Sequence, residues 1–353
     1  MTLATKTCMH TIIGDHTEEH QITCDKWLAS FSGGNLAVQT SSSSSSGTTL
    51  TGGDNYVTLT TGCYYLSTTA DNCDKVSYVG SQKTIKIDGD VTICLNGQQI
   101  QKVGNTTGSV FEVPSGSTLT LTDCKGNGQV MCDHSSNGSG VYVNGGTLNL
   151  YSGQIANSNG QNGTGSNQSN RYGGGVYMES GTFNMYGGTI TKNDAHYGGG
   201  VYVKSGTFNM YGGTIEKNTS NGGTGELIIF GGAGVYMESG NFIMKNAASV
   251  TANTIGYGKT AGAGVYVKSG TFEMNDNASV TDNKAKNTSS SGSSGGGVYV
   301  KSGTFKMNGN ASVTGNKATY GTLSGGGVYV ERGTFEMNGE KTSVSGNAAA
   351  VAI

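Results

Sequence analysis

Hydrophobic and polar residues alternate in short runs along most of the chain, and the same runs return many times. Residues 198–218, for example, read GGGVYVKSGTFNMYGGTIEKN. They contain a Val-Tyr-Val run, a Phe-Asn-Met run and a Thr-Ile run, separated by glycine-rich corners. Alternation with a period of two is typical of β-strands that have one face buried and one face outward. Each unit therefore predicts three short strands.

The unit occurs in seven copies, which begin at Val141, Val176, Val201, Val235, Val265, Val298 and Val328. The spacing between copies varies from 25 to 35 residues, but the offsets inside a copy are fixed. A Leu or Phe follows seven residues after the first Val, and a Leu or Met follows nine residues after it. The variable length falls between the end of one copy and the Val of the next, so we expect all insertions to leave from one corner. Such self-similarity predicts a repeat architecture.

We predict an all-β fold, a right-handed parallel β-helix of three-strand coils, in which one coil stacks on the next at about 4.8 Å. Two further coils, around Ile85 and Phe111, bring the predicted number to at least nine. We expect an N-terminal cap with the first strands in residues 1–80 and the repeat domain in residues 81–353. The core ladder should contain a phenylalanine column and an asparagine column with mutual amide hydrogen bonds: Phe183, Phe208, Phe242, Phe272, Phe305 and Phe335, and Asn193, Asn218, Asn253, Asn283, Asn316 and Asn347.

The composition of the chain excludes several classes of function. The chain has 61 Gly, a single Pro, 12% charged residues and a net charge of −2. Strict periodicity argues against disorder despite the glycine content. No basic stripe is present to hold phosphates, so we expect no nucleic-acid partner. No run approaches the 18 apolar residues of a membrane span, and residues 1–35 show no apolar segment typical of a signal peptide.

The N-terminal region holds the one constellation with metal-ligand chemistry. Four residues within a short stretch could bind zinc tetrahedrally: Cys8, His10, His16 and His20. The alternative is a polar terminus whose cysteines form disulfides, since the spacing matches no established zinc motif. Cys63 and Cys73 bracket a short loop that a disulfide would close, and Cys94 and Cys124 could be bonded between neighbouring coils. Seven cysteines leave one over, or allow an intermolecular bond.

Three sequence segments carry a resemblance to a known group of proteins. DGDVTICLNGQQI, GSTLTLTDCKGNG and the repeated GGGVYV, SGTFNM and GGTI motifs are similar to large surface β-helix proteins of Gram-positive gut bacteria. They resemble more distantly the repeats of polymorphic outer-membrane proteins and autotransporter adhesins. The resemblance covers about residues 80–353. It implies export, display at the cell surface and an adhesive or structural role, and it brings no catalytic residues.

A column of aromatic residues is the first candidate binding site. The second position of each copy is Tyr, between two inward apolar residues, so we expect the rings to point to solvent. Such a strip could stack on sugar rings or pair with another copy of itself, or it could only stiffen the sheet. The residues are Tyr142, Tyr177, Tyr202, Tyr236, Tyr266, Tyr299 and Tyr329.

The C-terminal segment is the second candidate site. After Asn347 the sequence AAAVAI takes the place of GGGVYV, so Val351 and Ile353 would begin another coil. We expect this end to dock on the N-terminal end of another copy and give a head-to-tail fibre. The alternative is that the sequence is a fragment of a longer protein.

Enzymatic activity is considered because polysaccharide lyases and hydrolases use this fold. Those reactions need convergent carboxylates, or Ca²⁺ held beside a basic residue. The outward carboxylates here are scattered singly, and Asp123, Asp133 and His134 form the nearest approach to a site. Ice binding is not expected either, since Asn241 interrupts the Thr column and no flat Thr-x-Thr array is apparent.

The sequence therefore predicts a non-enzymatic, extracellular β-solenoid without a cofactor. It would act as a structural rod that assembles into surface fibres or presents an adhesive face to a glycan or a host surface. The alternative is a glycan-binding adhesin module that acts as a monomer; a polysaccharide lyase or hydrolase is a more distant possibility.

Overall fold

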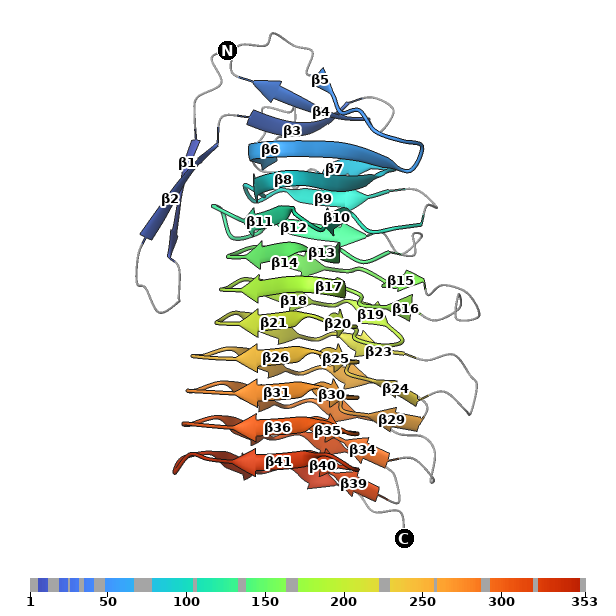
Figure 1. Ribbon diagram of the computed structural model, residues 1–353, viewed down its shortest axis with the longest axis vertical. Helices are drawn as coiled ribbons and strands as arrows, with labels where there is room; N and C mark the ends of the chain where they lie inside the picture. The colour runs from blue at the N-terminus through green and yellow to red at the C-terminus, as the bar shows by residue number, and fades with distance from the viewer. Residues whose placement is uncertain are drawn as a thin grey trace.

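The protein is an elongated parallel β-solenoid (Figure 1). The computed structural model describes residues 6–11, 19–24, 26–31, 35–40, 48–66, 78–103, 107–132, 138–162, 171–221, 229–256, 259–286, 293–319 and 323–349. Within these ranges every regular element is a β-strand and none is a helix. The predicted all-β parallel solenoid is thus confirmed.

The first two runs of each coil, which are two short strands or one long strand, pair with the same runs of the neighbouring coils and form the first set of stacked strands. The Val-Tyr-Val and Thr-Phe runs each pair in parallel with the same run of the next coil, for instance Val235 with Val265 and Phe242 with Phe272. The strands are β6 (Tyr56–Leu66), β8 (Thr84–Cys94), β10 (Phe111–Pro114), β11 (Thr118–Thr122), β13 (Val141–Leu150), β17 (Val176–Met185), β20 (Val201–Val203), β21 (Thr207–Met210), β25 (Val235–Met237), β26 (Asn241–Met244), β30 (Val265–Val267), β31 (Thr271–Met274), β35 (Val298–Val300), β36 (Thr304–Met307), β40 (Val328–Val330) and β41 (Thr334–Met337).

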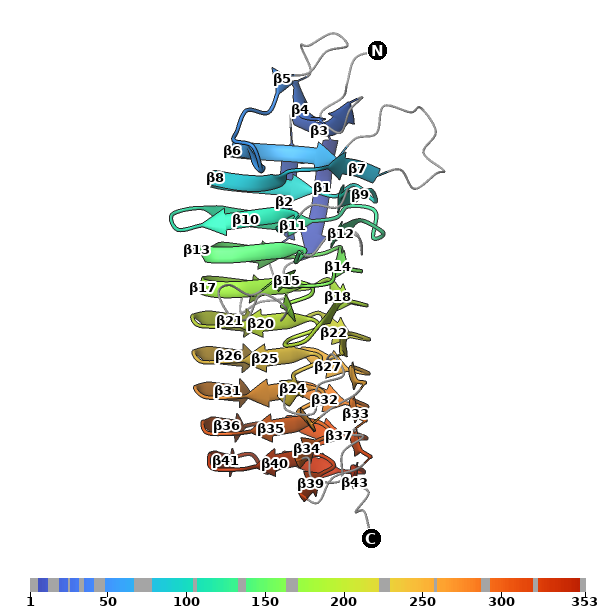
Figure 2. The same ribbon diagram turned by 90° about the vertical axis from the view of Figure 1, so that its right-hand side faces the viewer.

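The third run of each coil forms a ten-stranded parallel sheet in the described part of the chain. Its strands are β7 (Tyr78–Ser81), β9 (Gln99–Lys102), β12 (Gln129–Cys132), β14 (Gln154–Ala156), β18 (Thr189–Thr191), β22 (Thr214–Glu216), β27 (Ser249–Thr251), β32 (Ser279–Thr281), β37 (Ser312–Thr314) and β42 (Ser343–Ser345). Figure 2 shows this sheet along one side of the molecule.

A narrower sheet follows the corner after each of these strands. It contains β19 (Asp194–Ala195), β23 (Thr219–Ser220), β28 (Thr254–Ile255), β33 (Lys284–Ala285), β38 (Lys317–Ala318) and β43 (Ala348–Ala349). The segment of variable length then adds short outer strands: β15 (Gln161–Asn162), β16 (Arg171–Tyr172), β24 (Ile229–Gly231), β29 (Lys259–Ala261), β34 (Ser293–Gly295) and β39 (Leu323–Gly325). The insertions therefore leave from one corner, as predicted.

The inward residues of the coils form one continuous apolar core. The phenylalanines from Phe183 to Phe335 stack with ring centroids 4.5–4.9 Å apart and nearly parallel planes. One coil cannot bury its inward face alone, but a column of coils can. The predicted phenylalanine column is confirmed.

The asparagine ladder is confirmed as well. From Asn193 to Asn316, each side-chain amide donates to the side-chain oxygen of the next asparagine at 2.9–3.0 Å, ending on Asn347. Each backbone N–H in the series donates to the same oxygen at 2.9–3.1 Å. The five asparagines from Asn193 to Asn316 are fully buried. The ladder thus satisfies polar groups that burial would otherwise leave without partners.

The N-terminal strands precede these coils. β1 (Lys6–Thr11) and β2 (Glu19–Cys24) form an antiparallel hairpin, while β3 (Lys26–Phe31) pairs in parallel with β6. β4 (Asn35–Thr40) and β5 (Thr48–Thr49) extend β3 through antiparallel pairs. Much of 1–80 lies outside the described residues, so the cap and the boundary at residue 80 stay predictions. No described segment is a helix long and apolar enough to cross a membrane.

Candidate functional site

The tyrosine column lies where the sequence places it, in register along the Val-Tyr-Val strands. Neighbouring rings from Tyr142 to Tyr329 lie 4.6–5.3 Å apart. The expectation that these rings point to solvent is wrong for the central four, which are only 3–7% exposed: Tyr202, Tyr236, Tyr266 and Tyr299. Their ring faces are therefore not open to a sugar or to a second copy.

The cover over this column comes from the variable segments. Tyr172 packs edge-on against Tyr202 at 5.0 Å, and Tyr197 packs against Tyr236 at 5.3 Å. The glycines before each Val-Tyr pair permit a very close crossing of the chain: a Cβ on Gly173, whose φ is +55°, would lie 2.7 Å from the Cα of Tyr177. The glycine-rich corner was the signal in the sequence for this cover.

Three phenol groups of the column donate hydrogen bonds to carboxylates. The hydroxyl of Tyr177 donates to Glu179, that of Tyr202 to Glu238, and that of Tyr299 to Glu331 at 2.6 Å. Burial, followed by the hydrogen bond to Glu238, raises the pKa of Tyr202 far above its ordinary value. Burial also acts to raise the pKa of Glu238, but hydrogen bonds from Lys268 and Tyr202 outweigh it and leave the pKa of Glu238 below its ordinary value.

A shallow groove of about 550 Å³ is lined by two of these carboxylates, Glu179 and Glu238. Lys204 binds Glu179, and Lys268 binds Glu238 at 2.7 Å, so the charges in the groove pair between adjacent coils. The serines that follow donate to backbone carbonyls of the preceding coil, as Ser269 does to Glu238 O at 2.6 Å. The groove is thus a satisfied polar surface, and its acidic groups do not converge as an acid–base pair would.

The ten-stranded sheet carries a face that the sequence analysis missed. The outward positions of β27, β32, β37 and β42 hold only Ser and Thr in two parallel columns, and β18 adds Thr189 and Thr191. Ser279 Oγ donates to Ser249 Oγ at 3.2 Å, and Thr281 Oγ1 donates to Thr251 Oγ1 at 3.0 Å. This array holds Ser in one column and mainly Thr in the other, so it is not the Thr-x-Thr array that the sequence analysis did not find. It lies in the Ser-Val-Thr strands and not in the Thr-Phe strands that carry the Thr column.

An ionic cluster lies at the corner where the longest insertion returns. Arg171 binds Asp194 at 2.6 Å, and Asn221 donates to the same carboxylate at 3.1 Å. The backbone N–H of Arg171 donates to His196 Nδ1 at 3.2 Å. Burial, followed by the charge of Arg171, lowers the pKa of His196, so the imidazole stays neutral near pH 7. The cluster fastens β16 to β19 and to the coil below.

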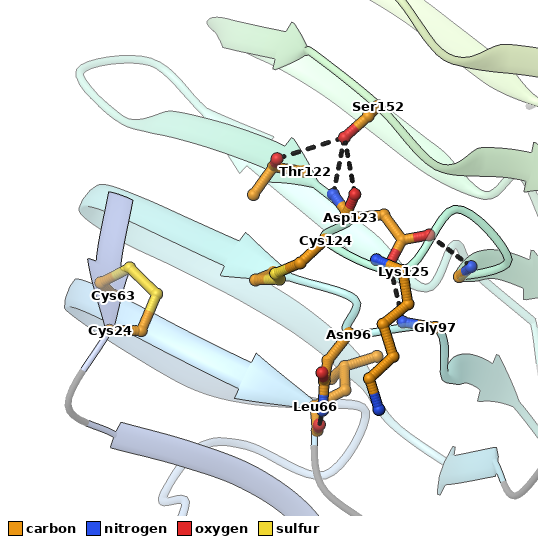
Figure 3. The surroundings of a disulfide bond; sticks show 12 residues. Cys24, Cys63, Leu66, Asn96, Gly97, Thr122, Asp123, Cys124, Lys125 and Ser152 are labelled. Atoms are coloured by element: carbon orange, nitrogen blue, oxygen red, sulfur yellow. Dashed lines mark hydrogen bonds between the residues drawn. A yellow bond between two sulfur atoms is a disulfide. The ribbon is translucent and has the colours of Figure 1, made fainter. Parts of the chain in front are cut away.

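The residues named for possible catalysis do not come together in the described part of the chain. Asp123 is buried, and its carboxylate accepts backbone N–H groups of Gly97 at 2.7 Å and Gly128 at 2.6 Å (Figure 3). It therefore holds a turn. Asp133 and His134 lie outside the described residues.

Three of the four predicted zinc ligands, Cys8, His10 and His20, lie in the strands of the β1–β2 hairpin. His10 and His20 are directly opposite each other in its register, and Cys8 is opposite Ile22. His16 lies outside the described residues. Among the residues that the structure does describe, no group of three or more His, Cys, Asp or Glu could hold a metal. The zinc set as a whole stays a prediction.

The cysteines form two disulfides in the described ranges, Cys24–Cys63 and Cys94–Cys124. The bond between neighbouring coils at Cys94 and Cys124 is confirmed. A bond between Cys63 and Cys73 is wrong, because β3 places the adjoining Cys24 beside β6, where Cys63 lies.

The predicted docking residues Val351 and Ile353 lie outside the described residues. In the last described coil, the side chains of Met337 and Val344 are 45% and 37% exposed. Phe335 is half-buried there, whereas the other phenylalanines of the column are fully buried.

In the described residues, these features define a β-solenoid repeat protein with buried columns of phenylalanine and tyrosine and an outward face of Ser and Thr hydroxyls. No protein-family model matches the chain, and no curated protein or solved structure is significantly similar to it. The resemblance to surface proteins of Gram-positive gut bacteria accordingly stays a prediction beyond the fold.

Proposed function

We propose that this protein is a non-enzymatic, extracellular structural rod. The observation that carries the proposal is the uninterrupted stack, in which one core runs from β6 to β41 and the phenylalanine and asparagine columns repeat in every central coil. Because each coil is hydrogen-bonded in parallel to its neighbours, the body resists bending along its whole length. The two disulfides support an oxidising location outside the cytosol.

The absence of enzymatic activity is part of this proposal. Support comes from the outward carboxylates Glu179 and Glu238, which bind lysines of adjacent coils and tyrosine hydroxyls. A general acid and base need carboxyl groups that face one substrate position at different protonation states. We expect no cleavage of plant or mucin polysaccharides by the purified protein. Release of reducing or unsaturated sugar ends above a heat-treated control would contradict this part.

Head-to-tail self-association is the mode of assembly that we propose for the rod. It is supported by the apolar groups Met337 and Val344 that the last described coil exposes. An exposed coil edge with apolar side chains favours addition of another strand layer. Electron microscopy of concentrated protein should show fibres of uniform width, and the double variant Met337→Lys, Val344→Lys should give short rods. Short rods from the unaltered protein, or fibres that persist in the double variant, would contradict head-to-tail assembly.

A glycan-binding adhesin is the second candidate function, and the open Ser/Thr face favours it. Only Glu216 adds a charge among the outward residues of β18, β22, β27, β32, β37 and β42. An uncharged array of hydroxyls with a regular repeat of about 4.8 Å suits a neutral, extended polysaccharide laid along the rod.

Sedimentation with insoluble neutral polysaccharides tests this second function. The double variant Thr251→Glu, Thr281→Glu should lose binding, while Glu273→Gln on the neighbouring stack should retain it. Equal binding by both variants would exclude the Ser/Thr face.

A further inference from the structure

A lysine is buried inside the N-terminal part of the solenoid. β9 alternates outward Gln with inward residues, and its inward residues are Ile100 and Lys102. Lys102 is only 1% exposed, and its Nζ donates to Thr84 Oγ1 at 2.8 Å. Among the described residues, no carboxylate forms an ion pair with Lys102. A buried ammonium without a carboxylate partner is costly, so the groups that face this side chain need to be identified.

The residue stacked directly on Lys102 is a cysteine. β9 and β12 pair in parallel, and their register makes Lys102 and Cys132 partners in adjacent coils. Both side chains point inward, because Val130 and Cys132 are the buried residues of β12. The two reactive atoms lie around the same glycine: a Cβ on Gly108 would be 3.5 Å from Lys102 Nζ, and Cys132 Sγ is 4.0 Å from Gly108 O.

The environment also favours reaction between these two groups. Burial lowers the pKa of Lys102 to about 8, and the charge of Cys132 acts to raise it. A substantial fraction of the amine is therefore neutral near physiological pH, which is the form that attacks an electrophile. Cys132 belongs to neither described disulfide.

We propose that Lys102 and Cys132 are joined by an oxidatively formed covalent crosslink, a sulfenamide in which Nζ is bonded to Sγ. A peroxide first oxidises the thiol to a sulfenic acid, consuming one hydrogen peroxide and releasing one water. The neutral amine then attacks sulfur, the S–N bond forms, and the sulfenic oxygen leaves as a second water with one proton from nitrogen. Sulfenic acids undergo the same condensation with backbone nitrogen. A thiol reductant returns the amine and the thiol.

The position of the crosslink in the fold indicates that it would stabilise two N-terminal coils. The Cys94–Cys124 disulfide joins the same two coils at another corner, and both pairs are separated by 30 residues in the chain. Figure 3 shows Cys124 beside the turn that Asp123 holds. These two coils precede both the phenylalanine column and the asparagine ladder, which start at Phe183 and Asn193. A second covalent bond would fasten coils that lack those columns.

Peptide mapping of the full chain tests the proposal. Protein treated with hydrogen peroxide is digested without reductant and measured by mass spectrometry. We expect a linked pair of peptides that contains Lys102 and Cys132 and is two hydrogens lighter than their sum. Trypsin should fail to cut after Lys102 in that sample, and dithiothreitol should restore both peptides and the cleavage. Formation should become faster as the pH rises from 7 to 9, because the neutral amine reacts.

Variants separate the crosslink from general oxidation. Cys132→Ser and Lys102→Gln should each abolish the linked pair, whereas Lys86→Gln, a lysine of the adjacent β8 strand, should leave it unchanged. Circular dichroism checks that each variant remains folded. If a variant does not fold, the peptide mapping of the unaltered protein decides. Recovery of Cys132 as a sulfinic or sulfonic acid with Lys102 unmodified would overturn the proposal. So would a Cys132 thiol that stays reduced in excess peroxide, in protein whose disulfides are intact.

Discussion

Asn253 shows how a single side chain stabilises the stack. Its Oδ1 accepts two hydrogen bonds from Asn218, and its Nδ2 donates to Ile215 O at 3.0 Å and to Asn283 at 2.9 Å. The side chain is fully buried, so each of these groups depends on it for a partner. The residue identity is thus fixed by both neighbouring coils.

We predict that Asn253→Ala lowers the free energy of unfolding by about 3 to 5 kcal/mol, since several buried donors and acceptors lose partners that are each worth about 1–3 kcal/mol. Urea denaturation measures this loss. Asn277→Ala removes an exposed outward amide of a neighbouring coil, which accepts from Asn310, and should change stability by less than about 0.5 kcal/mol. Equal effects of the two variants would contradict the role of the ladder.

Lys102 gives a prediction for pH. Its pKa is lowered from 10.5 to about 8, so between these values the unfolded chain binds a proton that the folded chain does not. Folding stability of the reduced protein should therefore rise as the pH rises from 8 to 10, and the cost below pH 8 should approach about 3 kcal/mol. Lys102→Met should be the more stable protein at pH 7, and the difference should shrink by pH 10. A difference independent of pH would contradict a buried, uncompensated amine.

The strands show which features the sequence determines. Phe242 and Asn253 could be placed because the same residue type returns at a fixed offset in each copy, and parallel stacking converts that offset into a column. The burial of Tyr236 could not be predicted, because its cover includes Tyr197, which lies in a segment of variable length and composition. The partner of Cys63 was missed for the same reason, since Cys24 belongs to the non-repeating N-terminal strands.

The phenylalanine column provides a matched pair of variants. Phe242 is stacked between Phe208 at 4.6 Å and Phe272 at 4.9 Å, whereas the half-buried Phe335 contacts only Phe305 within this column. We predict that Phe242→Ala costs about 3–5 kcal/mol, as for a buried Phe, and that Phe335→Ala costs less than half of that. Urea denaturation followed by circular dichroism compares them. A larger loss for Phe335→Ala would mean that the stack does not run in this order.

The tyrosine column predicts the behaviour at alkaline pH. Burial raises the pKa of Tyr142 and Tyr197 to about 12, and that of Tyr236 still further. Above pH 10 the unfolded chain loses phenolic protons that the folded chain keeps, so stability should fall as the pH rises beyond 10. The phenolate absorbance of the folded protein should appear at higher pH than that of the protein in denaturant. Coincident titration curves would show that the rings are open to solvent.

At the scale of the whole molecule, the described coils form one column, and noncovalent contacts and disulfides both join neighbouring parts of it. Parallel hydrogen-bonded ladders join the described coils throughout, stacked phenylalanines are added in the central and C-terminal coils, and disulfides are added near the N-terminus. Figures 1 and 2 show the coils in chain order along the long axis. Because contacts are made mainly between adjacent coils, length follows from the number of copies. The length of such a rod can change with the number of copies while its cross-section stays the same.

Distances between spin labels test the in-register parallel stack most directly. Labels would be introduced through non-natural amino acids at equivalent outward positions of the ten-stranded sheet, so that the native cysteines stay unaltered. With Thr189 as the fixed site, labels at Ser279, Ser312 and Ser343 are three, four and five coils away. The account predicts narrow distributions whose means increase by about 4.8 Å per coil. Distances that do not increase with coil number, or broad distributions that overlap, would contradict the parallel solenoid.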